Sequence, residues 1–281
     1  MRKVKEYVNS YFELNETILS SSYPGITKHK LLQEFLNYSH LKAHEIYLGQ
    51  SSKFFLFLKE GYPLEYIQRS SYFYKSNFYV DKNVLIPRSE TEILVEDSIN
   101  FITKKYHDTF SIAEIGVGSF CIGLSILAEV NKSLIFEGYD ICTKAIDIAN
   151  VNYFRLSSKI NPLSKVLLSL NDRLENINTK YDFIVSNPPY IKLNIDKIQV
   201  HDKVDQYEPS VALYIDDDKY TSWFEEFFKQ VSNCLLDGGA FFMEGHEDHL
   251  KRLESIAKKY FNKTEIKKDY THRDRFLHSY K

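Results

Sequence analysis

The stretch SIAEIGVGSFCIGLSILAEVNKSLIFEGYD, from Ser111 to Asp140, decides the fold class. An apolar run at 111–115 leads into two closely spaced glycines, and a helical pattern follows at 122–130. A second apolar run at 134–139 then ends directly before Asp140. Short apolar runs of this length are typical of buried strands, and the intervening periodicity is that of a helix. The stretch therefore predicts one β-α-β unit with two parallel strands.

The alternation of strands and helices continues beyond this unit. A helical pattern at 143–155 is followed by short apolar runs at 165–168 and 182–186. A further apolar strand is predicted at 240–243, and the segment 264–280 reads as an antiparallel pair. Parallel strands joined by helices are covered on both faces and bind ligands at their carboxyl ends. We therefore expect an α/β fold with a seven-stranded Rossmann-like sheet.

The part of the chain before this sheet has a different pattern. Apolar residues recur at helical spacing between Val4 and Leu58, and the sequence Gly61-Tyr62-Pro63 should end the last of these helices. Aromatic runs at 72–74 and 78–80 flank a predicted turn at 75–77, which indicates a β-hairpin. The pattern Ser89-Glu90-Thr91-Glu92 resembles a capping box and predicts a helix from there to about Tyr106. The predicted organisation is a helical domain at 1–68, a hairpin linker at 69–88 and the main domain at 89–281.

Bulk properties disfavour several classes of protein. A net charge of −2 gives none of the basic surplus typical of nucleic-acid binders, so direct nucleic-acid binding is not expected. Charged residues recur within Met1–Glu13, where a signal peptide would need a continuous apolar stretch, and no long apolar stretch follows. This pattern predicts a cytoplasmic protein without a membrane segment. Cys121, Cys142 and Cys234 lack paired spacing and should be reduced thiols. The segment His246–His249 lacks the HExxH spacing and reads as a surface loop rather than a metal site.

The first candidate site is the glycine turn that follows the strand at 111–115. Glycines at this point let the backbone approach a ligand, and the start of the next helix offers free N–H groups. Asp140 follows Gly118 by 22 residues at the end of the next strand, where a carboxylate can accept both hydroxyls of a ribose. Asp172 could accept the amino group of an adenine, and Arg173 could cover the ring. The candidate cofactor-binding residues are Glu114, Gly116, Val117, Gly118, Ser119, Phe120, Asp140, Asp172, Arg173 and Asn187.

The second candidate site indicates the chemistry. The strand at 182–186 runs into Asn187-Pro188-Pro189-Tyr190, and the two prolines leave rigid carbonyl acceptors without competing donors. The carbonyls of Asn187 and Pro188 can each accept one proton of a planar –NH2 group, while Tyr190 stacks on its plane. Such contacts aim a weakly nucleophilic amide nitrogen at a sulfonium methyl group. The favoured hypothesis is methyl transfer from S-adenosylmethionine, with Asn187, Pro188, Pro189 and Tyr190 as the catalytic candidates. The alternative is an ordinary Pro-Pro turn after a strand.

Several longer segments resemble the HemK/PrmC-type release-factor glutamine methyltransferase family over nearly the full chain. Leu85–Glu92 looks like its LIPRPETE segment, Val185–Ile191 like its VSNPPYI, and Tyr207–Leu213 like its FEPxxAL. Gly61–Ile67 is similar to its GxPxQYI and Asp269–Arg275 to its closing DyxgxdR. The resemblance implies an N-terminal substrate-docking helical domain, a hairpin linker and a catalytic domain that binds S-adenosylmethionine. It also implies a peptide chain release factor as substrate, methylated at the glutamine of its Gly-Gly-Gln loop.

Departures from the family pattern leave alternatives open. Phe120 replaces the last glycine of the family's cofactor loop and would crowd the methionine part of the cofactor, Arg173 replaces an aromatic residue, and Ile215–Asp218 replaces a glycine-rich segment. A divergent paralogue that methylates a small molecule or another protein, a nucleic-acid adenine methyltransferase and a binding protein without catalysis are the alternatives. Arg88 is either a cation of the cleft or part of a structural ion pair, and Glu208 lies either in a turn or at the site.

Overall fold

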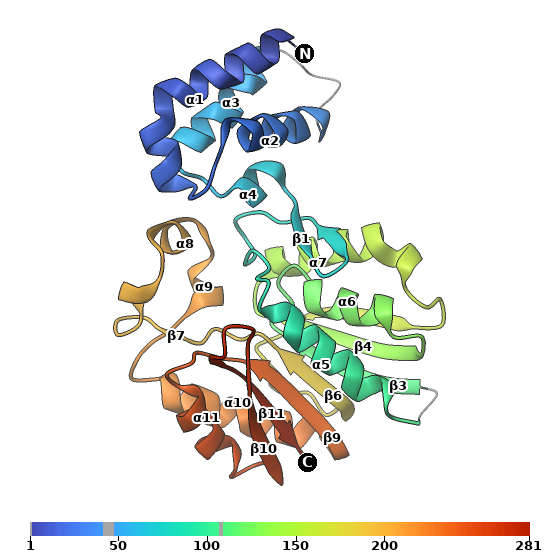
Figure 1. Cartoon of the computed structure of the whole chain (residues 1–281). Coiled ribbons are helices and arrows are strands. Elements are labelled where there is room, and N and C mark those ends of the chain that lie inside the picture. The colour runs from blue at the N-terminus through green and yellow to red at the C-terminus, as the bar shows by residue number, and fades with distance from the viewer. Residues whose placement is uncertain (1, 42–47, 107–108) are drawn as a thin grey trace.

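Helices form the N-terminal part of the chain, at one end of the molecule (Figure 1). The computed structural model describes residues 2–41, 48–106 and 109–281. Four helices are α1 (Arg2–Ser22), α2 (Lys28–Leu41), α3 (Leu48–Lys59) and α4 (Leu64–Gln68). They enclose a core of their own, in which the rings of Phe35, Phe54 and Phe55 contact one another. The predicted helical pattern is present, and its residues 42–47 lie outside the described residues.

A hairpin of two short strands follows these helices. Strands β1 (Ser71–Phe73) and β2 (Ser76–Phe78) pair in antiparallel fashion, so that Phe73 and Phe78 both reach the core of the main domain. The hairpin is confirmed, but its predicted turn at 75–77 is wrong. The turn consists of Tyr74 and Lys75, and Tyr74 takes a left-handed φ of 53°, which an aromatic residue rarely adopts.

The seven-stranded sheet predicted from the sequence is confirmed. Its strand order is β10-β11-β9-β6-β3-β4-β5, in which β9, β6, β3, β4 and β5 run parallel and β11 is antiparallel to both of its neighbours. The strands are β3 (Thr109–Ile115), β4 (Ser133–Asp140), β5 (Lys165–Leu170), β6 (Tyr181–Ser186), β9 (Leu235–Glu244), β10 (Lys263–Lys268) and β11 (Asp274–Tyr280). Since β3, β4 and β6 are neighbours, their carboxyl ends meet at one edge of the sheet.

Helices cover both faces of the sheet, which gives three layers. The helices of one face are α5 (Thr91–Thr103), α6 (Cys121–Glu129) and α7 (Thr143–Leu156), and those of the other are α10 (Tyr220–Cys234) and α11 (Leu250–Ala257). Each face has its own cluster of buried aliphatic and aromatic side chains. Burial on both faces explains why the central strands β3 and β6 read as continuous apolar runs rather than as alternating ones.

The predicted capping box before α5 does not form. The helix begins at Thr91 and ends at Thr103, not at Tyr106, and no side chain caps its first turn. The hydroxyl of Ser89 donates to Glu90 at 3.1 Å. Glu92 instead accepts the backbone N–H of Tyr74 at 2.9 Å. A tertiary contact with the hairpin therefore replaces the local reciprocal bonds of a capping box.

The segment between β6 and α10 forms elements that the sequence pattern did not reveal. They are β7 (Ile191–Lys192), η2 (Lys197–Gln199), α8 (Asp202–Tyr207), α9 (Ser210–Leu213) and β8 (Tyr214–Ile215), and a further short helix, η1 (Ser157–Lys159), follows α7. The segment touches the N-terminal helices. The Nζ of Lys203 and the hydroxyl of Tyr207 donate to the carbonyl of Glu60, at 3.2 and 2.7 Å. No helix in the described ranges is long and apolar enough to cross a membrane.

Candidate active site

A cavity of about 370 Å³ lies where β3, β4 and β6 end. It is enclosed by the glycine turn after β3, the loops after β4, β5 and β6, and parts of the segment that precedes α10. The sequence-predicted residues that line it are Glu114, Gly116, Val117, Gly118, Ser119, Asp140, Asp172, Arg173, Asn187, Pro188 and Pro189. The fold therefore brings the two candidate sites into one cavity, as expected for the carboxyl edge of a parallel sheet.

The glycine turn is open on the cavity side. Gly116 and Gly118 have left-handed φ values of 73° and 50°, which residues with a Cβ rarely adopt. A Cβ placed on Gly118 would have no neighbour within 4 Å, and one on Gly116 would meet only the carbonyl of Asn187 at 3.9 Å. The N–H groups of Gly116 and Val117 donate to the carbonyl of Tyr139, at 2.8 and 3.1 Å, and tie the turn to β4. A ligand can therefore approach this backbone closely.

Asp140 ends β4 and holds the same turn through its carboxylate. One oxygen accepts the N–H of Gly118 at 2.9 Å and the other accepts the N–H of Cys142 at 2.9 Å. Burial raises the pKa of Asp140, and these backbone hydrogen bonds oppose that shift. Each carboxylate oxygen has a second lone pair, so both can still accept a hydroxyl from a ligand.

Glu114 lies beneath the turn rather than at its surface. Its side chain is buried, and its Oε2 accepts the N–H of Gly123 in α6 at 3.0 Å. Burial raises the pKa of this carboxyl well above its ordinary value, and the nearby Asp140 adds to the shift. Glu114 thus joins β3 to the beginning of α6 and fixes the turn between them.

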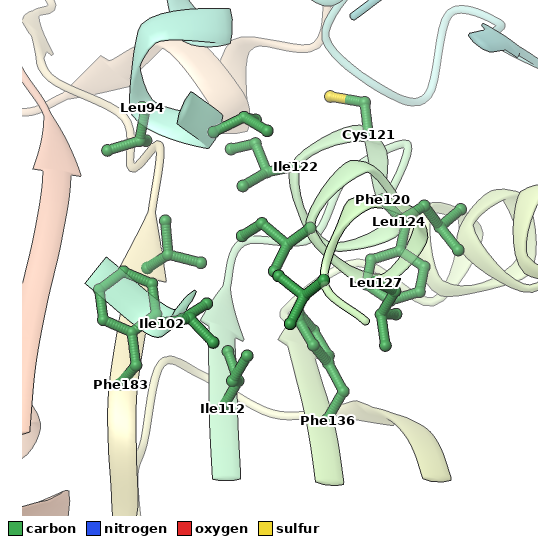
Figure 2. Close-up of a cluster of buried hydrophobic side chains, with 14 of the residues drawn as sticks. Leu94, Ile102, Ile112, Phe120, Cys121, Ile122, Leu124, Leu127, Phe136 and Phe183 are labelled. Carbon is green, nitrogen blue, oxygen red and sulfur yellow. The ribbon is translucent and has the colours of Figure 1, made fainter. Parts of the chain in front are cut away.

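Phe120 does not crowd the cavity, and this corrects the expectation from the sequence. Its backbone is left-handed, with φ at 64°, so the position does favour glycine. Its side chain is fully buried in the core and packs against Phe136 at 5.3 Å between ring centres (Figure 2). Phe120 does not line the cavity. Gly123 provides the space for the ring, because a Cβ there would lie 2.2 Å from a ring carbon of Phe120.

Asp172 and Arg173 follow β5 and bind each other. The guanidinium donates to both carboxylate oxygens of Asp172, at 3.0 and 3.1 Å, and its carbon lies 5.1 Å from the centre of the Trp223 ring. Trp223 also lines the cavity, although the sequence analysis did not select it. All three residues line the cavity, where an aromatic ring could lie against the guanidinium.

The Asn-Pro-Pro-Tyr segment is anchored by its two polar side chains. The side-chain amide of Asn187 donates to Thr91 Oγ1 at 3.3 Å and to Glu244 Oε2 at 3.2 Å. The hydroxyl of Tyr190 donates to Glu244 Oε1 at 3.0 Å. Tyr190 is half-buried and does not line the cavity, whereas Asn187 and Pro188 do. The polar segment at the end of β6 thus has a defined orientation.

Glu244 is another residue beside this site that the sequence analysis missed. It ends β9, the strand next to β6, and its side chain is 1% exposed. Burial raises its pKa, while hydrogen bonds from Thr91 and Tyr190 and the charge of Arg275 oppose the shift. The signal was a single acidic residue directly after the buried apolar run at 240–243. A buried carboxylate at the carboxyl end of a parallel strand favours a site.

Arg88 is both a cavity residue and part of an ion pair. Its guanidinium lies 2.5 Å from Glu208 Oε1, and the other oxygen of Glu208 accepts the N–H of Ile86 at 3.0 Å. The Glu208 side chain is 2% exposed, so Glu208 forms a buried link rather than an ordinary turn. The pair fixes the segment before α9 to the chain that precedes α5.

The remaining polar candidates do not form a metal centre. His249 lies 2.8 Å from Asp196, and both it and His246 are half-buried, so the segment is less exposed than predicted. Within residues 2–41, 48–106 and 109–281, no group of three His, Cys, Asp or Glu is placed to hold a metal ion. The three cysteines are free, and burial raises the pKa of Cys121 to about 12.

Comparison with known proteins identifies the fold and the family. The family model described as the methyltransferase small domain matches residues 91–204. The solved structure of the hMettl16 catalytic domain, in complex with the MAT2A 3′UTR hairpin 6, aligns with a TM-score of 0.53. The alignment covers 72% of this chain and 74% of that chain at 16% identity, which shows the fold alone. Strand order, glycine turn and family model together define a class I, Rossmann-like methyltransferase.

Two sequence relatives specify the family. The release factor glutamine methyltransferase of Flavobacterium psychrophilum is 32% identical over 242 residues, which cover 84% of this chain and 82% of the relative. The release factor glutamine methyltransferase of Mycoplasma mycoides subsp. mycoides SC is 34% identical over 222 residues, or 76% of this chain and 74% of the relative. The chain belongs to the release factor glutamine methyltransferase family.

Proposed function

We propose that this protein transfers a methyl group from S-adenosylmethionine to the side-chain amide nitrogen of a glutamine in a peptide chain release factor. The observation that carries the proposal is the placement of Asn187 and Pro188 in the same cavity as the glycine turn and Asp140. Donor and acceptor sites of a methyl transfer have to adjoin, and one cavity lined by both meets that need. The names of the relatives support the choice of release factor as substrate.

The residues around the glycine turn fit S-adenosylmethionine. When bound, this cofactor supplies a methyl group activated by the positive sulfur. The open backbone at Gly116 and Gly118 leaves room for its methionine part, and Asp140 has free lone pairs for its ribose hydroxyls. Asp172 would accept the adenine amino group, and Arg173 would lie against the ring. Phe120 poses no steric obstacle, because its ring lies in the core.

Asn187 and Pro188 would hold the glutamine amide. Its two protons would be accepted by the side-chain carbonyl of Asn187 and the backbone carbonyl of Pro188, which aims the nitrogen at the methyl group. These acceptors also favour the positive charge that develops on the nitrogen during transfer. The hydroxyl of Tyr190 is bound to Glu244 and the residue does not line the cavity, so we assign Tyr190 to the support of this segment and not to the predicted stacking on the substrate amide.

We also propose that the helical part of the chain, residues 1–68, docks the release factor. Its helix α1 exposes the apolar side chains of Tyr7 and Leu14, which lie two helical turns apart and are 54% and 84% exposed. Leu14→Glu should raise KM for the whole release factor and leave turnover of a short glutamine peptide unchanged. Equal KM values of the wild type and Leu14→Glu for the whole release factor would contradict a docking role for this face.

The decisive experiment is mass spectrometry of a purified, unmodified release factor after incubation with this protein and S-adenosylmethionine. The expected result is one added methyl group that maps to the glutamine of the Gly-Gly-Gln loop. Asn187→Ala should abolish the transfer and leave cofactor affinity within a few fold, because Asn187 serves the acceptor. An unmodified release factor, with cofactor binding shown by calorimetry, would disprove the proposed substrate.

A further inference from the structure

The buried carboxylate of Glu244 lies directly behind the acceptor site. Strands β6 and β9 pair in register, with Ser186 opposite Met243, so the next residues on the two strands are Asn187 and Glu244. We propose that Glu244 is a positioning residue, which fixes the side-chain amide of Asn187 with its carbonyl oxygen toward the substrate. The proposal rests on the proposed function and adds to it a residue that does not touch the substrate.

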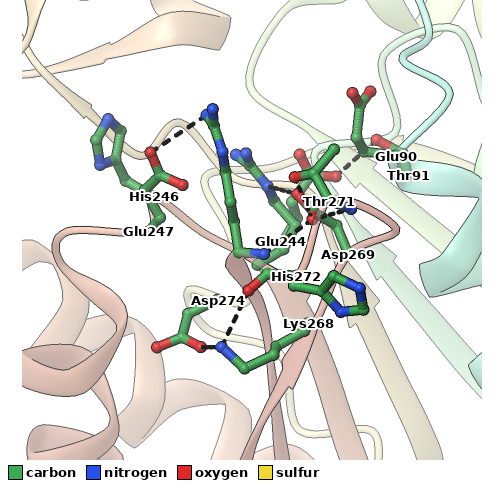
Figure 3. A network of polar contacts seen from close by, with 12 residues as sticks. Glu90, Thr91, Glu244, His246, Glu247, Lys268, Asp269, Thr271, His272 and Asp274 are labelled. Carbon is green, nitrogen blue, oxygen red and sulfur yellow. Dashed lines mark hydrogen bonds and ion pairs between the residues drawn. The ribbon is translucent and has the colours of Figure 1, made fainter.

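Three hydrogen bonds occupy Glu244. Its Oε2 accepts the hydroxyl of Thr91 at 2.6 Å and the side-chain amide of Asn187 at 3.2 Å, while Oε1 accepts the hydroxyl of Tyr190 at 3.0 Å. Thr91 comes from α5, and its side chain extends from that helix toward the carboxylate (Figure 3). Thr91 and Glu244 are 2% and 1% exposed, so water cannot replace these partners. The carboxylate thus joins α5, β6 and β9 at one point.

The chemistry of these partners allows only one orientation of the Asn187 amide. An ionised carboxylate accepts hydrogen bonds and cannot donate them. The hydroxyl of Thr91 donates its only proton to Glu244, so its oxygen faces Asn187 as an acceptor as well. Two acceptors require the –NH2 group of Asn187 to point inward. A reversed amide would set its carbonyl oxygen against two other oxygens and leave buried groups unsatisfied.

The orientation matters because the two sides of the Asn187 amide have opposite roles. With –NH2 held inward, the carbonyl oxygen on the other branch faces the cavity that Asn187 lines. A substrate amide nitrogen presents two protons and needs acceptors. A reversed Asn187 would present donors to it and prevent the aligned complex. Glu244 therefore acts on catalysis through Asn187 and not by contact with the reacting atoms.

Several groups of the same network act on the charge of Glu244. Burial raises its pKa, and the acidic Glu90 adds to that shift. The hydroxyls of Thr91 and Tyr190 and the positive charge of Arg275 act in the opposite direction. Arg275 in turn lies 3.4 Å from the buried Asp269. The two hydroxyls and Arg275 thus support the ionised carboxylate against its burial, and this is the form that accepts all three hydrogen bonds.

The test compares Glu244→Gln with Glu137→Gln. The glutamine at 244 keeps the size of the side chain but can donate a hydrogen bond to a reversed Asn187. Glu137 is the matched control, because it also accepts two buried hydroxyls, from Tyr139 and Tyr181, and does not line the cavity. In a methylation assay with a release factor, Glu244→Gln should lower kcat on the order of 10²-fold. Its KM for the release factor and its Kd for S-adenosylmethionine should stay within a few fold, and Glu137→Gln should keep the wild-type kcat.

A second readout follows the amide itself and needs no activity. In protein labelled with 15N-asparagine, the side-chain –NH2 signal of Asn187 is identified by its loss in Asn187→Asp. Glu244→Gln should shift this signal, and Glu137→Gln should not. Thr91→Val removes one of the two inward acceptors and should give a smaller loss of kcat, which keeps the proposal testable if Glu244→Gln folds poorly.

The possible results separate the proposals. If the wild-type protein does not methylate the release factor, the proposed function fails, while the –NH2 signal still decides the orientation of Asn187. A wild-type kcat in Glu244→Gln, or an unshifted Asn187 signal, would overturn the positioning role. A parallel loss of kcat and cofactor binding in Glu244→Gln would show a structural role only.

Discussion

Replacing Phe120 by glycine separates the packing of this residue from its backbone strain. The side chain is fully buried, and removal of a buried phenylalanine side chain destabilises a protein by roughly 3–5 kcal/mol. Its φ of 64° costs a residue with a Cβ about 1–2 kcal/mol, and glycine avoids that strain. Phe120→Gly should therefore lower the free energy of unfolding by about 2–3 kcal/mol.

Phe120→Ala provides the control for this reasoning, because alanine loses the ring and retains the strain. Urea unfolding should place the wild type above Phe120→Gly, and Phe120→Gly above Phe120→Ala by about 1 kcal/mol. Calorimetry on the folded variants should give S-adenosylmethionine affinities within a few fold of the wild type, since Phe120 does not line the cavity. An alanine variant as stable as the glycine variant, or a tenfold loss of affinity in both, would refute this account.

Gly123 extends the same prediction. A Cβ at this position would lie 2.2 Å from the Phe120 ring and 2.4 Å from Glu114 Oε2, so Gly123→Ala should be strongly destabilising. In the Phe120→Gly background the first of these contacts is absent, and the penalty for Gly123→Ala should be smaller. Additive free energies of unfolding in a double-mutant cycle would contradict the direct contact between the two residues.

Three further outcomes follow from the structure. Asp140→Ala should weaken cofactor binding at least tenfold, because the ribose contacts are lost and the glycine turn is loosened. Calorimetry measures this affinity, and an unchanged value would remove Asp140 from the cofactor site. Arg88→Ala should lower the free energy of unfolding by about 3 kcal/mol, because the carboxylate of Glu208 would be left buried without its cation; a urea midpoint equal to the wild type would argue against that pair. Burial lowers the pKa of His278 from 6.5 to about 3. Between pH 3 and pH 6.5 the unfolded chain therefore binds more protons than the folded protein, and the free energy of unfolding falls as the pH drops below 6.5. Between pH 6.5 and 5 the free energy of unfolding should fall by about 2 kcal/mol in the wild type and should not show this fall in His278→Gln. Equal pH slopes for the wild type and the variant would exclude His278 as the source.

The sequence predicted the central sheet well because its signals are local. The central strands β3 and β6 are buried on both faces over most of their length and appear as apolar runs at 111–115 and 182–186. The position of Asp140 was predictable for the same reason, since it directly follows such a run and meets the glycine turn at the sheet edge. Local sequence patterns are sufficient to predict elements that follow one another in the chain and also lie side by side in the structure.

The features that the sequence did not reveal depend on contacts between distant residues. Glu92 has the spacing of a capping box, yet it binds Tyr74 in the hairpin. From the sequence, Phe120 was expected to crowd the cofactor loop. In the structure its ring packs against Phe136 in the space that Gly123 leaves. Glu244 stands 57 residues from Asn187 in the chain, and only the order of the strands brings them together.

The pairing of β6 with β9 makes methyl transfer a sensitive reporter of the native state. Successive side chains of a strand point to opposite faces, so a slip of one residue between these strands would turn Glu244 away from Asn187. The cofactor half of the cavity rests on β3 and β4. Methyl transfer therefore depends on the register of β6 and β9, to which cofactor binding alone is not sensitive.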